Sequence, residues 1–203
     1  MYMAATIRKA GRAPQKMLYG VSEKNENGGE TMERRIETKR LILRTVTPDD
    51  AEAIFQWASD PDVNKYMIYP LHKDTEVTRE WLKSRDINGK DEFDLGFVLK
   101  ETGELIGQGG MFYHEDIDAW SIGYNLRKEY WGRGLVPEAI QAIIDCVDRE
   151  KGVRAVVGEF AKDNQKSGRV MEKLGMTYWK DSRYAKLDGS VTFESCKYIK
   201  EFR

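Results

Sequence analysis

Residues 120–139 read WSIGYNLRKEYWGRGLVPEA, and this stretch decides the fold. Its first part, from Trp120 to Leu126, alternates apolar residues with small or polar ones, which predicts a β-strand. From Leu135 onward the apolar residues recur at helical spacing, which predicts an amphipathic helix with one buried face. A short glycine-containing segment joins the two, so we expect a tight strand-to-helix connection.

This connection, Gly132-Arg133-Gly134, has the features of an anion site. The first turn of a helix presents free backbone N–H groups and the positive end of the helix dipole, and small residues let phosphates approach the backbone. A plain tight turn is the alternative interpretation. Two other phosphate motifs are excluded: Pro137 stands where a dinucleotide fingerprint needs its third glycine, and no Walker-type sequence occurs.

Patterns on both sides of this stretch predict an α/β (α+β) fold, with a mixed sheet covered by helices. Thr47 and Pro48 are typical of a helix start, Asp163 or Asn164 can cap a later helix, and Gly175 can close it. The predicted strands are 41–43, 93–99, 105–113, 120–126, 154–160, 176–184 and 191–198, and the predicted helices are 47–58, 75–87, 135–147 and 164–174.

Composition indicates one soluble domain. The chain has 203 residues, with 33 basic and 34 acidic side chains and a net charge of -1, so no overall field favours nucleic acid or an anionic membrane. No apolar run approaches the about 18 residues of a spanning helix. The two cysteines, Cys146 and Cys196, lack disulfide or metal spacing, which predicts reduced thiols and a cytoplasmic protein.

Residues 1–35 differ from the rest, because Arg8, Lys9, Arg12 and Lys16 come before any acidic residue. We interpret them as an extension, either disordered or a translated leader ahead of a natural start at Met32. The domain itself is expected over residues 36–203.

Several ordered motifs resemble the GNAT acyltransferase superfamily, and within it the RimJ/RimL-type branch. They are the Ile122–Leu126 run, the Tyr130–Ala139 segment, Asn164-x-x-Ser167 and Glu172–Met176, within a likeness over about 36–198. The opening Glu37–Arg44 is also typical of that branch. The resemblance implies a mostly antiparallel sheet flanked by helices, acetyl-CoA as co-substrate and no metal.

The resemblance also implies the cofactor-binding residues. Backbone N–H groups of the glycine segment would hold the pyrophosphate, and Leu126 and Arg127 at the strand end would pair with the pantetheine amides. Asn164 would bind the pantetheine arm or only cap its helix. The residues of the glycine segment are Trp131, Gly132, Arg133, Gly134, Leu135 and Val136.

For the chemistry, the resemblance implies direct attack of an amine on the thioester. Leu126 would donate its N–H to the developing oxyanion. The tyrosine that many members use as acid falls here on Met171, so Ser167 is assigned the thiolate contact and the acid role. Relatives often carry a glutamate base where this chain has Ser121; His114, Glu115 and Asp116 at the preceding turn are substitutes, and a water relay is left open.

The predicted acceptor is a primary amine, either a protein amino-terminus such as that of a ribosomal protein or a small molecule. Tyr66, Met67, Tyr69 and His72 would form part of its wall. A homodimer is also expected. The alternative function is a catalytically inactive CoA-binding sensor or interaction module.

Overall fold

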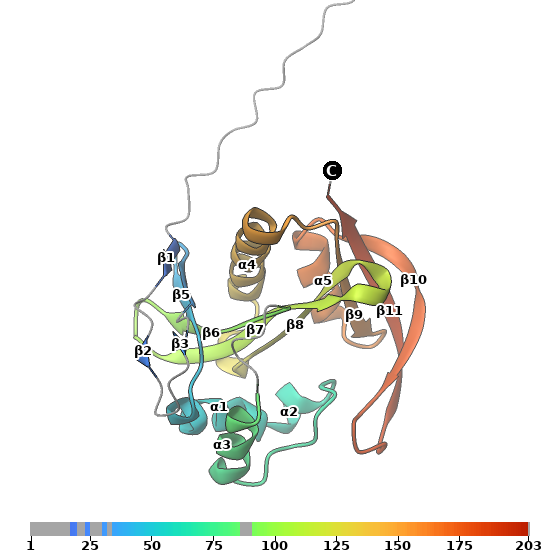
Figure 1. Cartoon of the computed structure of the whole chain (residues 1–203). Helices are drawn as coiled ribbons and strands as arrows, with labels where there is room; N and C mark the ends of the chain where they lie inside the picture. The colour runs from blue at the N-terminus through green and yellow to red at the C-terminus, as the bar shows by residue number, and fades with distance from the viewer. Residues whose placement is uncertain (1–16, 20–22, 25–29, 32–33, 86–90, 203) are drawn as a thin grey trace, which may run out of the picture.

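Among the residues that the structure describes, the main sheet has nine strands in the order β1-β4-β5-β6-β7-β8-β9-β11-β10 (Figure 1). The computed structural model describes residues 17–19, 23–24, 30–31, 34–85 and 91–202. Within these ranges β8 and β9 pair parallel, and the other neighbours in this sheet pair antiparallel. The mixed, mostly antiparallel sheet is therefore confirmed. Its strands are β1 (Met17–Tyr19), β4 (Arg34–Glu37), β5 (Leu41–Arg44), β6 (Glu92–Leu99), β7 (Leu105–His114), β8 (Ala119–Leu126), β9 (Ala155–Ala161), β10 (Thr177–Ala185) and β11 (Thr192–Glu201), and β2 (Glu23–Lys24) and β3 (Glu30–Thr31) form a separate pair.

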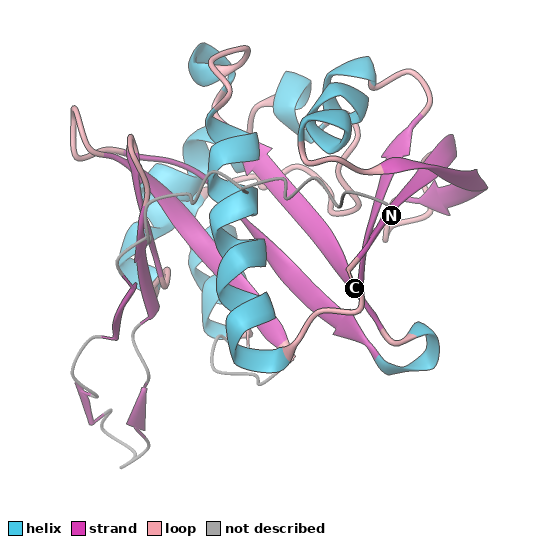
Figure 2. Cartoon of the chain, turned by 90° about the horizontal axis from the view of Figure 1, so that it is seen from above, coloured by secondary structure: helices cyan, strands magenta, loops and turns pink. Residues whose placement is uncertain are grey.

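Helices cover both faces of this sheet. Figure 1 shows α4 (Leu135–Lys151) and α5 (Gln165–Lys173) on one face, and α1 (Ala51–Ala58), α2 (Pro61–Asn64) and α3 (Thr75–Lys83) on the other. Seen from above in Figure 2, the long helix α4 runs across the strands. Short 3-10 turns join several elements: η1 (Pro48–Asp50), η2 (Glu115–Ile117) and η3 (Lys128–Tyr130).

The core between the sheet and α4 fixes the start of that helix. Alternate residues of β6, including Phe93 and Phe97, are buried against α4, which contributes Ile140 and Ile143. Burying each such side chain stabilises the fold by about 1.5–3 kcal/mol. A smaller core that includes Trp57 packs α1 and α3 under the opposite face. The glycine segment before α4 is therefore held against a rigid layer.

Strands β8 and β9 separate after a short contact. They pair at Trp120 with Val156 and at Ser121 with Val157, and both continue beyond this without further pairing between them. Arg127 N–H donates to the Ile106 carbonyl at 2.8 Å. Because hydrogen-bonded and non-hydrogen-bonded pairs alternate along an antiparallel ladder, the N–H of the preceding Leu126 points away from β7, toward the gap.

Some boundaries differ from the sequence prediction. The single turn α2 was not predicted; Asp60 caps it by accepting a hydrogen bond from the Asp62 N–H. The helix expected over 75–87 ends at Lys83. Most of the extension predicted over residues 1–35 lies outside the described residues, so its nature stays a prediction.

Candidate active site

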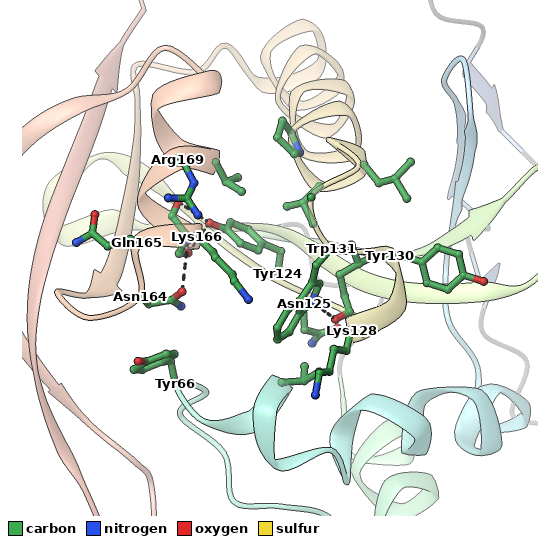
Figure 3. Close-up of a pocket in the computed structure, with 18 of the residues that line it drawn as sticks. Tyr66, Tyr124, Asn125, Lys128, Tyr130, Trp131, Asn164, Gln165, Lys166 and Arg169 are labelled. Carbon is green, nitrogen blue, oxygen red and sulfur yellow. Dashed lines mark hydrogen bonds between the residues drawn. The ribbon is translucent and has the colours of Figure 1, made fainter.

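A cleft of about 880 Å³ opens where β8 separates from β9 (Figure 3). Its walls come from the end of β8, the glycine segment, the start of α4, the start of α5, and α2 with the loop after it. It therefore runs past the predicted phosphate site. The predicted site residues that line it are Leu126, Trp131, Gly132, Gly134, Leu135, Val136, Asn164 and Ser167.

The glycine segment has the backbone of an anion cradle. Gly132 and Gly134 have positive φ values of 77° and 72°, which side chains rarely adopt. Gly134 is the N-cap of α4, so the free N–H groups of the helix start lie at the cleft wall beside Leu135 and Val136. A Cβ added at Gly132 would meet no atom within 4 Å, so this wall is unobstructed.

Arg40 braces this segment from the loop before β5, a role that sequence analysis missed. Its guanidinium donates to the Arg133 carbonyl at 2.8 Å and to the Gly134 carbonyl at 3.1 Å, and its Nε donates to Glu138 Oε2 at 2.7 Å. Burial alone would raise the pKa of Glu138, but hydrogen bonds from Thr38 and Arg40 outweigh it and the pKa is lowered. The branch-typical Glu37–Arg44 run contains Arg40, but its partners are far away in sequence.

Positive charge gathers along the cleft although the whole chain is nearly neutral. Among the described residues, five basic ones line it against two acidic ones, Asp62 and Asp163. The Lys166 ammonium lies 4.0 Å from the centre of the Trp131 ring, and the indole N–H of Trp131 donates to the Leu126 carbonyl at 2.8 Å. This local excess favours an anionic ligand. The basic residues are Lys65, Lys128, Lys166, Arg169 and Lys173.

Two hydroxyl groups meet at the other wall of the cleft. Tyr124 Oη lies 2.6 Å from Ser167 Oγ, so β8 and α5 deliver them to one point (Figure 3). Burial raises the pKa of Tyr124 to about 12, although the hydrogen bond with Ser167 partly opposes this. Asn164 Oδ1 accepts from the Ser167 N–H at 3.4 Å and so caps α5. Tyr124 was not predicted as a site residue, because its partner lies in another element.

Four other predicted site residues lie elsewhere. The Arg127 N–H donates a hydrogen bond to the Ile106 carbonyl, and the Arg127 carbonyl accepts one from the Tyr130 N–H. Both main-chain groups of Arg127 therefore have partners within the protein. The Arg133 side chain stacks over the Tyr130 ring at 5.0 Å, and Arg133 does not line the cleft. His114 and Glu115 are exposed and also lie outside the lining.

His114 does have a partner on its own face of the sheet: its Nε2 lies 2.8 Å from Ser121 Oγ. Its role as a base stays a prediction. The described residues hold no group of three His, Cys, Asp or Glu side chains that could bind a metal. None of the helices within those ranges is long and apolar enough to cross a membrane.

A parallel strand pair that opens over a basic cleft, beside a glycine-rich helix start, is an arrangement in an α/β protein that suits a phosphorylated ligand. Residues 40–177 match the family model described as an acetyltransferase (GNAT) domain. The chain therefore belongs to the GNAT acetyltransferase family, whose members use acetyl-CoA. The protein is an enzyme of the N-acetyltransferase class. The alternative function, a catalytically inactive CoA-binding module, is not supported.

Three similar proteins illustrate the range of the family. YkkB of Bacillus subtilis (strain 168) is 33% identical over 73% of this chain and 88% of its own length. The [ribosomal protein uS5]-alanine N-acetyltransferase of Escherichia coli (strain K12) is 22% identical over 76% of this chain and 84% of its own. The microcin C7 self-immunity acetyltransferase MccE, solved with acetyl-CoA and AMP, has a TM-score of 0.71 at 19% identity, over 81% of this chain and 94% of its own. The last likeness shows the fold.

Proposed function

We propose that this chain transfers the acetyl group of acetyl-CoA to a primary amine by direct attack. The observation that carries the proposal is the convergence, along one basic cleft, of three features: the glycine-rich start of α4, the Leu126 N–H facing the strand gap, and the hydroxyl pair of Tyr124 and Ser167. They match the three needs of the reaction, which are a held cofactor, an oxyanion donor and a proton source.

The start of α4 would bind the pyrophosphate of the cofactor. Free N–H groups at Gly134, Leu135 and Val136 supply donors, and the lysines of the cleft supply positive charge. Arg40 would keep the loop carbonyls of Arg133 and Gly134 turned toward its own guanidinium and away from the phosphates. This is a positioning role, because Arg40 itself does not line the cleft.

The end of β8 would hold the reacting thioester. Leu126 has its carbonyl fixed by the indole of Trp131, which keeps this strand end in place. Its N–H can then donate to the acetyl oxygen as negative charge develops there. A preorganised donor of this kind typically contributes about 10²–10³-fold to the rate.

The Tyr124 and Ser167 pair would protonate the departing sulfur. The neutral amine nitrogen forms a bond to the acetyl carbon and loses one proton to solvent, the carbon–sulfur bond breaks, and the CoA thiolate takes a proton from this pair, which regains one from solvent. A phenol is closer in pKa to a thiol than an aliphatic hydroxyl is, so Tyr124 is the better proton source and Ser167 orients it. At neutral pH Tyr124 carries its proton, since the ordinary pKa of a tyrosine is about 10 and burial raises the pKa of Tyr124 further, to about 12.

The acceptor amine would enter at the end of the cleft formed by Tyr66 and Met67. Tyr69 and His72 form an aromatic cluster with Trp81 behind them, with ring centres 5.7 to 6.3 Å apart. The E. coli relative is named for acting on an alanine of ribosomal protein uS5. A protein amino-terminus is therefore one acceptor class, and a small amine is the other.

The test is a turnover assay with a panel of amino-terminal peptides and small primary amines, read by CoA release and by product mass. We expect at least one amine to gain an acetyl group in step with CoA release. Saturable acetyl-CoA binding without turnover across the whole panel would contradict the proposal.

A further inference from the structure

Three buried side-chain oxygens on one face of the sheet lack hydrogen-bond partners within the described part of the chain. They are Asp94 Oδ1, Gln108 Oε1 and Asn125 Oδ1. Leaving a buried acceptor unsatisfied costs about 1–3 kcal/mol, so three of them near one another call for an explanation.

The strand register brings the three side chains together. Gln108 on β7 lies directly opposite Asn125 on β8, and Asp94 on β6 lies opposite Gly110, two residues along β7 from Gln108. Residues opposite each other, and residues two apart, share a face of a sheet. This face is the one covered by α1 and α3, since the alternate residues Phe93 and Phe97 pack toward α4.

Hydrogen bonds link the group and orient its free atoms. Gln108 Nε2 donates to Asp94 Oδ2 at 2.9 Å, which leaves the Gln108 amide oxygen as the free atom. Asn125 Nδ2 donates to the Tyr69 hydroxyl at 3.4 Å, which leaves its oxygen free as well. Gln108 is 2% exposed and the Asp94 side chain 10% exposed. Every free atom of this trio is an acceptor, and the one other buried side-chain nitrogen or oxygen without a partner among the described residues is a donor, Nη1 of Arg85, whose Nη2 pairs with Asp94.

The trio is connected to the cleft. Asn125 lines it, next to Tyr124 and Leu126 on the same strand. Beside Asn125, at Gly123, an added Cβ would lie in ordinary van der Waals contact with the Phe112 ring at 3.5 Å, so a methyl group fits at this position. Asn125 is therefore the member of the trio that a ligand in the cleft meets first, and Asp94 and Gln108 lie behind it.

From these contacts we infer that Asp94, Gln108 and Asn125 form the subsite for the amino group of the acceptor, and that the acceptor enters as a primary ammonium. Its three N–H groups would satisfy the three free oxygens. Asp94 would then take one proton, and the neutral amine turns so that the freed lone pair faces and attacks the acetyl carbon. The nitrogen gives its second proton to solvent as the carbon–sulfur bond breaks. The inference rests on the proposed acetyl transfer and names its proton acceptor.

The surroundings of Asp94 suit a carboxylate that gains and loses a proton. Arg85, just after α3, lies 2.6 Å from it, and Glu92 on the same strand also pairs with Arg85. The Tyr69 hydroxyl faces the group from the loop after α2. Burial raises the pKa of Asp94, and the charge and hydrogen bond of Arg85 partly oppose this.

The binding test uses the protein saturated with CoA and two cations as probes. Methylammonium carries three N–H donors, and tetramethylammonium carries the same charge without donors. We expect methylammonium chloride to raise the melting temperature saturably above the value in tetramethylammonium chloride at equal ionic strength. Equal effects of the two salts would overturn the inference and would indicate that the oxygens are met by water alone.

Variants test whether the trio, rather than another part of the cleft, binds the cation. Gln108→Met removes the amide at similar size, and Gly123→Ala places a methyl group beside Asn125, against the Phe112 ring. We expect both to abolish the difference between the two cations. Gln141→Met on α4, where Gln141 bonds Asp145, is the matched control and should retain it. A Gln108→Met protein that still discriminates between the cations would contradict the assignment.

A kinetic test examines the proton transfer with any amine that the enzyme accepts. We expect Asp94→Asn to lower kcat by about 100-fold and to leave the KM for acetyl-CoA unchanged. The fall of kcat at acidic pH, which the unsubstituted protein should show, should be absent in this variant. Absence of that fall in His114→Ala instead would transfer the role to His114. If calorimetry detects no CoA binding, the proposed function itself fails; if CoA binds and the cations act alike, this inference alone fails.

Discussion

The hydroxyl oxygens of Tyr124 and Ser167 lie 2.6 Å apart at the wall of the cleft, although the two residues are 43 positions apart in sequence. A hydroxyl of β8 and a hydroxyl of α5 can thus serve together as a proton source. Many family members use a tyrosine on α5 for this, at the position where this chain has Met171. Met171 is 1% exposed and packs in the core instead.

Removing the phenolic hydroxyl should slow the chemical step. For Tyr124→Phe we expect kcat to fall about 100-fold while the Kd for acetyl-CoA stays the same, since only the proton source is lost. Steady-state kinetics and calorimetry measure the two quantities. Tyr113→Phe is the control, because it loses a hydrogen bond to Asp118 outside the cleft and should keep full turnover. Unchanged kcat in Tyr124→Phe would remove this residue from the mechanism.

Removing the Arg40 brace should weaken cofactor binding. Arg40→Ala frees the carbonyls of Arg133 and Gly134 and leaves Glu138 without its charged partner. We expect the Kd for acetyl-CoA to rise about tenfold, which corresponds to about 1.4 kcal/mol. Arg35→Ala, which loses a surface pair with Glu37, should bind normally. Equal affinities in the two variants would show that the brace does not position the loop.

Alanine at Gly132 separates backbone strain from cofactor contact. Gly132 and Gly103 have φ values of 77° and 74°, and an added Cβ meets nothing within 4 Å at either site. Each substitution to alanine should therefore cost a similar 1–2 kcal/mol or so of stability. Only Gly132→Ala should also weaken acetyl-CoA binding, because Gly103 does not line the cleft. Urea unfolding and calorimetry check both halves, and equal binding by the two variants would contradict the cradle.

Acid should remove the stabilisation that Glu138 provides. Its pKa is lowered below the ordinary value of 4.5 in the folded protein, so its contribution is present above that pH and is lost as the pH falls through the folded pKa. Glu138→Gln should lower the free energy of unfolding by about 1–3 kcal/mol at pH 7. The difference in the free energy of unfolding between this variant and the unsubstituted protein should shrink when urea unfolding is repeated at lower pH. A difference in the free energy of unfolding that is constant from neutral to acidic pH would show that ionisation of Glu138 does not stabilise the fold.

Much of the fold was predictable because its elements carry local patterns. The alternation in β8, the apolar stripe of α4 and the capping residue Asn164 each depend on neighbours within a few positions. The turn α2 was missed because four residues carry no helical period, and its visible features are the Asp60 cap and Pro61.

The site was less predictable, because its contacts join distant residues. The glycine segment could be located from sequence, but the Arg40 brace spans 94 positions to Gly134. The grouping of Asp94 with Gln108 depends on the register of β6 and β7, which no local pattern reveals. The placement of His114 and Glu115 outside the cleft follows from where β7 ends, and their assignment stays a prediction, as do the homodimer and the cytoplasmic location.

The central claim is that the cleft holds acetyl-CoA and passes its acetyl group to an amine. The most direct measurement follows the isotope label of acetyl-CoA, labelled in the acetyl group, into amines of a host-cell extract by mass spectrometry, with the unsubstituted protein and Tyr124→Phe in parallel. We predict labelled products that form with the unsubstituted protein and are strongly reduced with the variant. Acetyl-CoA that binds in calorimetry but leaves no label on any amine would contradict the account.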